Sequence, residues 1–413
     1  VGLIAQEFFG GRTGRWAGTL YAVASVMGPA NDFQAANTEL FMNLPVLTAL
    51  WLCARSWVHK SLAGSEAGAL GLLMGAAVLI RPQAALALLP VAVTVCRLRV
   101  RWRPLLALLV GLALPALALL AWLWRADVLM DLRSSMTYAR YYTSCLPLRT
   151  KLVNGTLKSL LFLGVDVGLV IPVIGLLVYG RRRDEAWTQN AGCWLVSWLL
   201  ASAVAVTAGG RFYPHYFIQV LPPLVIMAAR QLTQGERGSD SRRAWGKAAL
   251  GLLALGAGMS VAVAVADRQV WPRQAWHQDR YRAVAEYVRV RTRPEARIFV
   301  WGNSPEIYLY SQRRMATRYM SVNYQTGRIW GTPANQPGHP PYRQDVPPQT
   351  WNNLMNDLER NRPAYIIDAA AGKLAKMDDD PIPRHPRMAA FLNHNYRLET
   401  TLLGVPVFRR TTP

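Results

Sequence analysis

Cysteine is scarce in this sequence, which argues against a fold held together by disulfide bonds or by thiolate–metal sites. The four cysteines are Cys53, Cys96, Cys145 and Cys193, and three of them lie in or beside apolar runs. Only Cys145 falls in a segment that we expect to face the outside, so no two cysteines can form a disulfide there. None of the four shows the spacing typical of zinc ligands. We therefore predict that all four are small apolar residues of the protein interior.

Acidic residues are also few: 24 Asp and Glu stand against 46 Lys and Arg, which gives a net charge of +22. A chain this basic commonly binds nucleic acid. Here, however, many of the cations lie in short loops between apolar runs, at Arg97–Arg103, Arg181–Arg183 and Arg230–Lys247. Such basic loops mark the cytoplasmic side of a membrane protein. We therefore exclude nucleic acid as a partner and expect membrane lipids instead.

Apolar residues are abundant, and they are gathered in runs rather than spread evenly. The runs are about 15 to 24 residues long, close to the roughly 20 that span a bilayer. They predict a polytopic α-helical protein of the cytoplasmic (inner) membrane with about nine complete spans and part of another at the start. Because alternate loops are basic, the C-terminus is expected on the outer face. The expected spans are 16–30, 40–57, 68–80, 84–97, 105–124, 157–180, 192–208, 216–229 and 248–266.

The tail has a different character, because its apolar runs shrink to strand length and charges become frequent. We divide the chain into a transmembrane domain, 1–266, and an extracytoplasmic α/β domain, 267–413. Periodicity in the tail predicts helices and short buried strands. The helices are expected near 280–291, 304–310 and 349–360, the strands at 296–302 and 364–368, and a hairpin over 396–410. The acidic run Asp378 to Asp380 is expected to be a solvated loop.

Three stretches of the predicted membrane domain combine charge with aromatic or polar side chains at the ends of apolar runs. The first is GGRFYPHYFIQVLPPL at Gly209–Leu224, with Arg211, His215 and Tyr216. The others are AANTELFMNLPVL at Ala35–Leu47 and GLLMGAAVLIRPQAAL at Gly71–Leu86. Cations and aromatic hydroxyls gathered at a membrane surface indicate a phosphate or sugar site.

These three stretches resemble those of bacterial membrane glycosyltransferases of the protein O-mannosyltransferase and lipid A aminoarabinose transferase type, which have the GT-C fold (glycosyltransferase family 39-like). The resemblance covers most of residues 1–266. It implies transfer of a sugar, with inversion, from a polyprenyl-phosphate donor to a lipid, glycan or protein acceptor at the outer face. The chain starts at Val1 inside a helix end. We therefore expect an N-terminally truncated sequence whose first helix, first outer loop and general base lie upstream.

The resemblance also gives roles to individual residues. Arg81, Arg211 and Tyr216 are expected to hold the donor phosphate, since arginine can grip phosphate oxygens with two parallel hydrogen bonds. His215 is expected to donate to the phosphate, carry a proton or bind a metal, so a divalent metal is left open as a cofactor. The alternative is that Arg81 snorkels to the interface and that the tyrosine and histidine residues belong to the interfacial belt.

Acidic residues supply the candidates for catalysis. Glu39 and, a few residues earlier, Asp32 correspond to the region where the resembling enzymes carry an acid near the sugar. A structural alternative for Glu39 is stabilisation by the helix dipole at a helix start, with Asn37 or Thr38 as the cap. Asp166 is expected about nine residues into its helix, facing a cavity or a neighbouring helix.

The outer segment between Arg125 and Thr156 contains MTYARYYTSC. Its aromatic and basic residues favour a helix lying in the membrane interface. We expect sugar or acceptor contacts from Tyr138, Arg140 and Tyr141.

A second class of protein remains open, a membrane transporter or flippase of a lipid-linked or anionic substrate. Many helices, a charged cavity and Asp166 would also serve that function. Transporters often show inverted repeats with broken helices in both halves, and we find no internal repeat. A third possibility is a polysaccharide ligase or polymerase, which also uses lipid-linked sugars.

Overall fold

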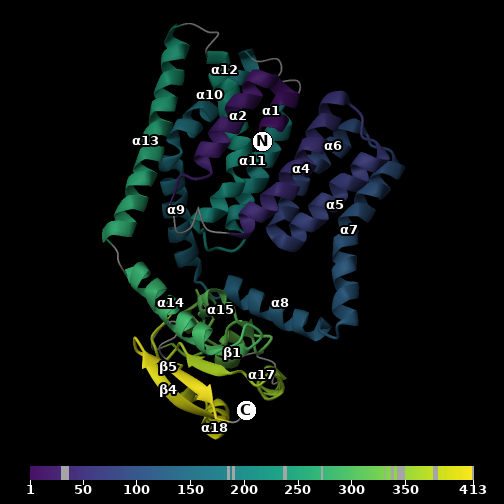
Figure 1. Ribbon diagram of the computed structural model, residues 1–413. Helices are drawn as coiled ribbons and strands as arrows, with labels where there is room; N and C mark the ends of the chain where they lie inside the picture. The colour runs from purple at the N-terminus through teal and green to yellow at the C-terminus, as the bar shows by residue number, and fades with distance from the viewer. Residues whose placement is uncertain are drawn as a thin grey trace. The chain divides into compact units, whose positions relative to one another are not determined.

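The computed structural model divides into two compact units (Figure 1). The first, here called the helical unit, is Val1–Leu129 with Pro147–Ala266; the second, the sheet unit, is Met130–Leu146 with Asp267–Pro413. Residues 130–146 thus group with the tail, although they lie within the first predicted domain. The structure describes residues 1–28, 37–183, 187, 191–235, 240–270, 273–329, 331–335, 339–341, 349–374 and 380–411.

The helical unit is built from α-helices and two 3-10 helices. Its interior includes nearly all of the helix that follows the Gly209–Leu224 stretch, where every side chain from Leu224 to Ala229 is buried. The elements are α1 (Gly2–Phe9), α2 (Gly11–Ala24), α4 (Thr38–His59), α5 (Gly64–Ile80), η1 (Pro82–Ala87), α6 (Leu88–Leu98), α7 (Trp102–Arg125), α9 (Leu148–Val165), α10 (Val167–Arg183), α11 (Gly192–Thr207), η3 (Pro214–Gln219), α12 (Leu221–Gly235) and α13 (Asp240–Val270).

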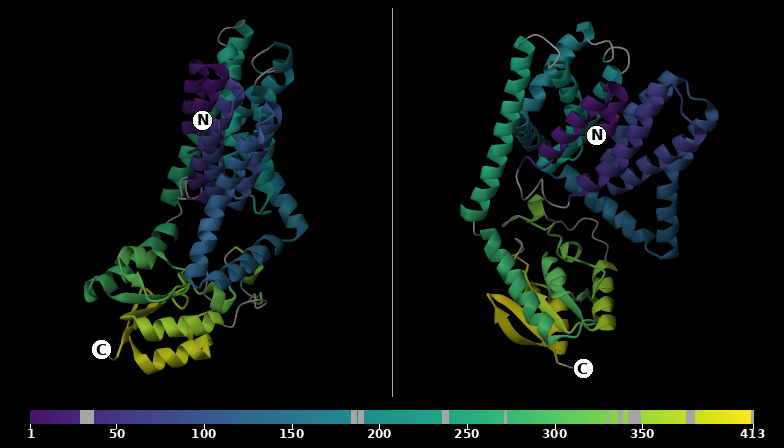
Figure 2. Two further views of the ribbon diagram at one scale, coloured as in Figure 1. Left: turned by 90° about the vertical axis from the view of Figure 1, so that its right-hand side faces the viewer. Right: turned by 45° about the horizontal axis from the view of Figure 1, so that its top comes forward.

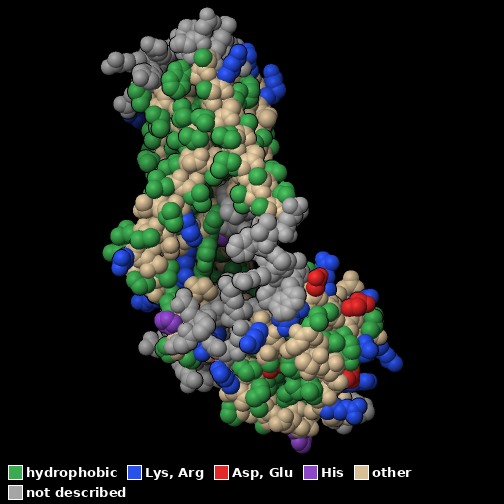
Figure 3. Space-filling model, turned by 90° about the vertical axis from the view of Figure 1, so that its left-hand side faces the viewer, with side chains coloured by type: hydrophobic (Ala, Val, Ile, Leu, Met, Phe, Trp, Pro, Cys, Tyr) green, Lys and Arg blue, Asp and Glu red, His purple; other side chains and the backbone are tan. Residues whose placement is uncertain are grey.

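Two described helices are long and apolar enough to cross a membrane: α7, and α13 over Ala244–Ala266. If the bent pair α9 and α10 forms one span, the described residues contain up to three candidate spans. The shorter apolar helices are α5, η1 with α6, and α11. Large apolar side chains of α7 and α13 are exposed, and Figure 3 shows hydrophobic side chains over one side of the helical unit. By length and apolarity alone, the described helices support two or three spans, fewer than the nine that the sequence predicts.

The prediction of one continuous helix over 157–180 is wrong, because α9 and α10 meet at a 90° bend. Asp166 lies at the break, not within a helix: its N–H donates to the Phe162 carbonyl, and its own carbonyl accepts from Leu169. Glycines allow the backbones on both sides of the bend to contact α13. A Cβ on Gly168 of α10 would collide with the Ala249 carbonyl, and a Cβ on Gly256 of α13 would collide with the Val165 carbonyl. Close backbone contact with a third helix, which the apolar pattern does not encode, therefore fixes the bend.

Helices α5 and α7 also approach closely through glycines. A Cβ added to Gly71 would collide with the Leu108 carbonyl, and one added to Gly111 would collide with the Gly68 carbonyl. Small residues at such positions allow two membrane helices to pack backbone to backbone. This pairing holds the helix that ends at Arg81.

The sheet unit contains one five-stranded sheet of order β2-β1-β3-β5-β4. Strand β1 (Arg297–Trp301) is parallel to β2 (Arg314–Met315) and β3 (Tyr365–Asp368), while β5 (Val405–Arg410) is antiparallel to β3 and to β4 (Tyr396–Leu402). The helical elements are α8 (Leu129–Ser144), α14 (Arg273–Arg291), α15 (Glu306–Ser311), α16 (Asn323–Thr326), η4 (Pro333–Asn335), α17 (Gln349–Asn361), η5 (Ile382–Arg384) and α18 (Pro386–Asn395).

Alternation along β1 explains why helices cover both faces of this sheet. Ile298 and Val300 pack into a core with α14 residues such as Val284, whereas Phe299 and Trp301 pack into a second core with α17 and α18. Figure 2 shows the helices and strands of this unit from two further directions. The predicted strands, the hairpin and the three helices are present; the two-residue β2, the helices α16 and α18 and the 3-10 helices η4 and η5 are additional.

Two sequence-based predictions about side-chain environment are wrong. Cys96 and Cys193 are exposed, not interior, although all four cysteines are free. Of the acidic run, Asp378 and Asp379 lie outside the described residues, and Asp380 is not solvated: its side chain is 13% exposed and pairs with Arg328 at 2.6 Å and with His385 at 3.5 Å. Arg328 also donates to the carbonyls of Ala334 and His339. Arg328 lies 52 residues before Asp380, and His385 follows it by five residues. The acidic run by itself therefore indicates neither partner.

The Asp380 pairing predicts a pH-dependent contribution to the stability of the sheet unit. Burial opposes ionisation, but hydrogen bonds from His385 and Arg328 prevail and lower the pKa of Asp380. A lowered folded-state pKa gives stability that is present at neutral pH and is lost as the pH falls below about 4, the ordinary aspartate pKa. Asp380→Asn should therefore reduce amide protection in β1 and β3 at pH 7, and the difference from wild type should vanish in acid.

The measurement is amide hydrogen exchange across this pH range, with Glu359→Gln, an exposed position on α17, as the control. An unchanged pH profile in Asp380→Asn would show that the pair does not stabilise the unit.

Candidate functional site

Three elements of the helical unit meet at one cluster of polar side chains: the start of α4, the junction of α5 with η1, and η3. The junction bends because Pro82 follows Arg81, and a residue before proline is held in extended backbone. Arg81 has φ −154° and ψ 118°, and it ends α5. Gly210, with φ 60°, adopts the left-handed conformation that glycine tolerates, in the turn that leads to η3.

Glu39 and Arg81 form the centre of this cluster. The Glu39 side chain is fully buried and makes an ion pair with Arg81, whose side chain is 14% exposed. The Arg81 guanidinium also donates to Thr38 Oγ1 at 2.9 Å and lies 4.2 Å from the centre of the Tyr216 ring. Thr38 donates in turn to Glu39 Oε2 at 3.1 Å. A buried carboxylate is stable only when paired, and Arg81 and Thr38 supply the partners of Glu39.

His215 extends the cluster toward the surface of η3. Its Nε2 lies 3.8 Å from Glu39 Oε1, and its ring stands edge-on to Tyr216, with 4.8 Å between centroids. On its other side it stacks on Tyr213, and the Lys158 ammonium lies 5.2 Å from the Tyr213 ring. The side chains therefore follow one another in the order Arg81, Tyr216, His215, Tyr213 and Lys158, with a cation at each end.

The structure brings together four of the predicted site residues: Glu39, Arg81, His215 and Tyr216. Arg211 is buried on the same segment, and its carbonyl accepts a hydrogen bond from Lys158 at 3.5 Å. The capping prediction for Glu39 is not met by Asn37, which makes no side-chain cap bond. Thr38 instead bonds the carboxylate itself.

The remaining predicted site residues do not join this cluster. Asp32 lies outside the described residues. Tyr138, Arg140 and Tyr141 lie on α8, which belongs to the sheet unit; the Tyr138 side chain is outside the described part of the chain, Arg140 is exposed and Tyr141 is half-buried. Their contact with sugar or acceptor stays a prediction.

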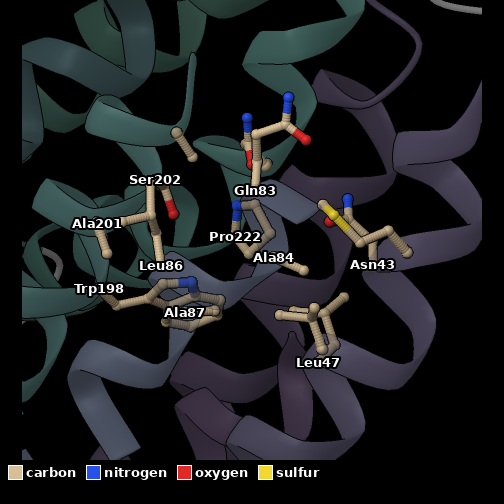
Figure 4. Close-up of a pocket in the computed structure, with 14 residues that line it drawn as sticks. Asn43, Leu47, Gln83, Ala84, Leu86, Ala87, Trp198, Ala201, Ser202 and Pro222 are labelled. Carbon is tan, nitrogen blue, oxygen red and sulfur yellow. The ribbon is translucent and has the colours of Figure 1, made fainter. Parts of the chain in front are cut away.

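A pocket with about 330 Å³ of empty volume, part of it open to solvent, lies between α4, η1, α11 and the η3–α12 segment. Figure 4 shows its mainly apolar lining, which includes Trp198 and Leu47. Four polar side chains also line it: Asn43, Gln83, Ser202 and Gln219. Sequence analysis missed them, although three follow a predicted site residue by two to four positions.

Asp166 is a further buried carboxyl in the helical unit. Its residue is 1% exposed, and its Oδ1 has no hydrogen-bond partner among the described residues. It lies at the bend between α9 and α10, where Phe162, one turn earlier, stacks on Phe217 of η3 at 4.8 Å. The bend is therefore packed directly against the element that carries His215 and Tyr216.

Within the described ranges, no three His, Cys, Asp or Glu side chains gather closely enough to hold a metal ion. The guanidinium of Arg81 is a group that binds anions such as phosphate. A guanidinium has five N–H donors, so Arg81 can bind a phosphate oxygen while it stays paired with Glu39.

Comparison of the chain with protein-family models, curated proteins and solved structures finds no match. The fold and the site by themselves define a mainly helical protein that has helices suited to a membrane and a small α/β unit. Its most distinctive local feature is the buried Glu39–Arg81 pair beside the pocket that contains the amides of Asn43, Gln83 and Gln219, here called the amide-lined pocket.

Proposed function

We propose that this protein transfers a sugar from a polyprenyl-phosphate donor to an acceptor at the outer face of the cytoplasmic membrane, as the resemblance of its three polar stretches implies. The observation that carries the proposal is the meeting of those stretches at one place. Glu39, Arg81 and His215 with Tyr216 come from three separate segments and contact one another. Segments far apart in sequence that converge on one guanidinium support an anion site.

In the proposed reaction Arg81 binds a phosphate oxygen of the donor, with Tyr216 below its guanidinium. The acceptor hydroxyl or amine attacks the anomeric carbon, the bond from that carbon to the phosphate oxygen breaks, and prenyl phosphate leaves with the electron pair. A carboxylate takes the proton of the acceptor. Glu39 keeps Arg81 oriented, because its buried carboxylate faces the guanidinium.

The proposed architecture is GT-C-like. The shorter apolar helices then cross the bilayer together with α7 and α13, as about nine spans, and the sheet unit lies on the outer face. The alternating basic loops support this orientation.

The proposal is tested with the full-length protein in liposomes that contain one polyprenyl-phosphate sugar at a time. We expect release of prenyl phosphate that depends on an added lipid, glycan or peptide acceptor, and no turnover of the matching nucleotide sugar, which carries no apolar chain. Folded protein that releases prenyl phosphate from none of the donors would contradict the proposal.

A transporter or flippase is the second candidate, favoured by one observation: the broken helix at Asp166. Broken helices with a buried carboxyl occur at the substrate sites of secondary transporters. In that case the same liposomes would move the lipid-linked sugar across the bilayer without breaking it, and Asp166→Asn would stop the movement.

A further inference from the structure

The amide-lined pocket continues inward from the Glu39–Arg81 pair along the same elements. On α4, Asn43 follows Glu39 by four residues and so lies on the same helix face. On the α5–η1 segment, Gln83 follows Arg81 by two residues, and on η3, Gln219 follows His215 by four. The pocket and the ion pair are therefore built on the same three segments.

The polar groups of this pocket are all uncharged. They are the primary amides of Asn43, Gln83 and Gln219 and the hydroxyl of Ser202. The rest of the lining is apolar, and no ionisable side chain is among the described residues that form it. The Gln83 Oε1 atom is buried and has no hydrogen-bond partner in the described part of the chain. It belongs to a residue that lines the pocket (Figure 4), and an unpaired amide oxygen is an acceptor for hydroxyl donors.

We propose that this pocket selects a single uncharged sugar ring of the donor; the inference rests on the proposed function. Amides and hydroxyls pair with the hydroxyls of a neutral sugar, whereas an ammonium or carboxylate on the sugar would be buried with no opposite charge in the pocket. A prenyl chain would leave the Gln83 Oε1 atom unpaired, which costs free energy.

The first test compares three donors that share one prenyl phosphate and differ only in the sugar: a neutral hexose, the corresponding amino sugar and the corresponding uronic acid. The neutral donor is expected to have a kcat/KM about 100-fold or more above either charged donor, since a site built for hydroxyl hydrogen bonds rejects a mismatched group strongly. Equal kcat/KM values for the three donors would overturn the inference and leave the transferase proposal standing.

The second test uses variants of the pocket. Gln83→Leu should raise KM for the neutral donor at least tenfold, whereas Gln6→Leu, at an exposed position on α1, should not. Gln219→Glu should improve the amino-sugar donor relative to the neutral one, because it adds a negative charge to the pocket. Thermal unfolding of each variant separates loss of fold from loss of binding.

An unchanged KM in folded Gln83→Leu would overturn the assignment of this pocket to the sugar. No turnover of any donor by the folded wild-type protein would instead contradict the transferase activity itself, and the sugar assignment with it.

Discussion

Replacing Arg81 with alanine is expected to abolish sugar transfer and to destabilise the helical unit at the same time. The guanidinium is the proposed phosphate ligand, and removing one such preorganised donor lowers kcat roughly 100- to 1,000-fold. Its loss also leaves the fully buried Glu39 carboxylate without its ion-pair partner. Removing one member of a buried pair costs about 3–5 kcal/mol. Donor turnover in liposomes and thermal unfolding in detergent measure the two effects.

The double variant Arg81→Ala with Glu39→Gln separates these effects. It removes the unpaired charge, so most of the lost stability should return while transfer stays abolished. Arg55→Ala is the matched control: Arg55 is 42% exposed and 3.9 Å from Glu7, and such a pair contributes at most about 1 kcal/mol. If the double variant regained transfer, Arg81 would be needed only to neutralise Glu39, and the phosphate role would be wrong.

Substituting Gly71 with alanine should disrupt the pairing of α5 with α7 and thereby displace Arg81. The added Cβ would collide with the backbone carbonyl of Leu108, which cannot move away as a side chain could. Overpacking of this kind costs about 1–3 kcal/mol or more. At the upper end this lowers the unfolding midpoint by roughly 6–12 °C for a domain of this size. We expect a reduced donor affinity in parallel.

Gly251→Ala is the control for this substitution. Gly251 is exposed on α13 and has no atom within 4 Å of a Cβ built there. Alanine is the better helix former by about 1 kcal/mol, so this variant should be as stable as wild type or more so. Equal midpoints for Gly71→Ala and Gly251→Ala would show that the close approach of α5 and α7 does not stabilise the unit.

The helices and strands were largely predictable, because local patterns determine them. Runs of apolar residues located α5, α7 and α11 within a few residues, and short buried runs located β1 and β3. The hairpin of β4 and β5 followed from two alternating segments around Leu403–Gly404. The bend at Asp166 was not predictable, since the glycine contacts there join it to α13, more than 80 residues later in the chain.

The sequence by itself determined the class of side chains at the site: an acid before one apolar run, an arginine before a proline, and a histidine and a tyrosine after a glycine pair. Only the tertiary structure decided that Glu39 pairs with Arg81 and that Asn43, Gln83, Ser202 and Gln219 surround one pocket. The physical reason is range. Helix formation and membrane insertion depend on neighbours along the chain, whereas an ion pair between residues 39 and 81 depends on how separate helices pack, and that packing is set by glycine and side-chain shapes throughout the unit.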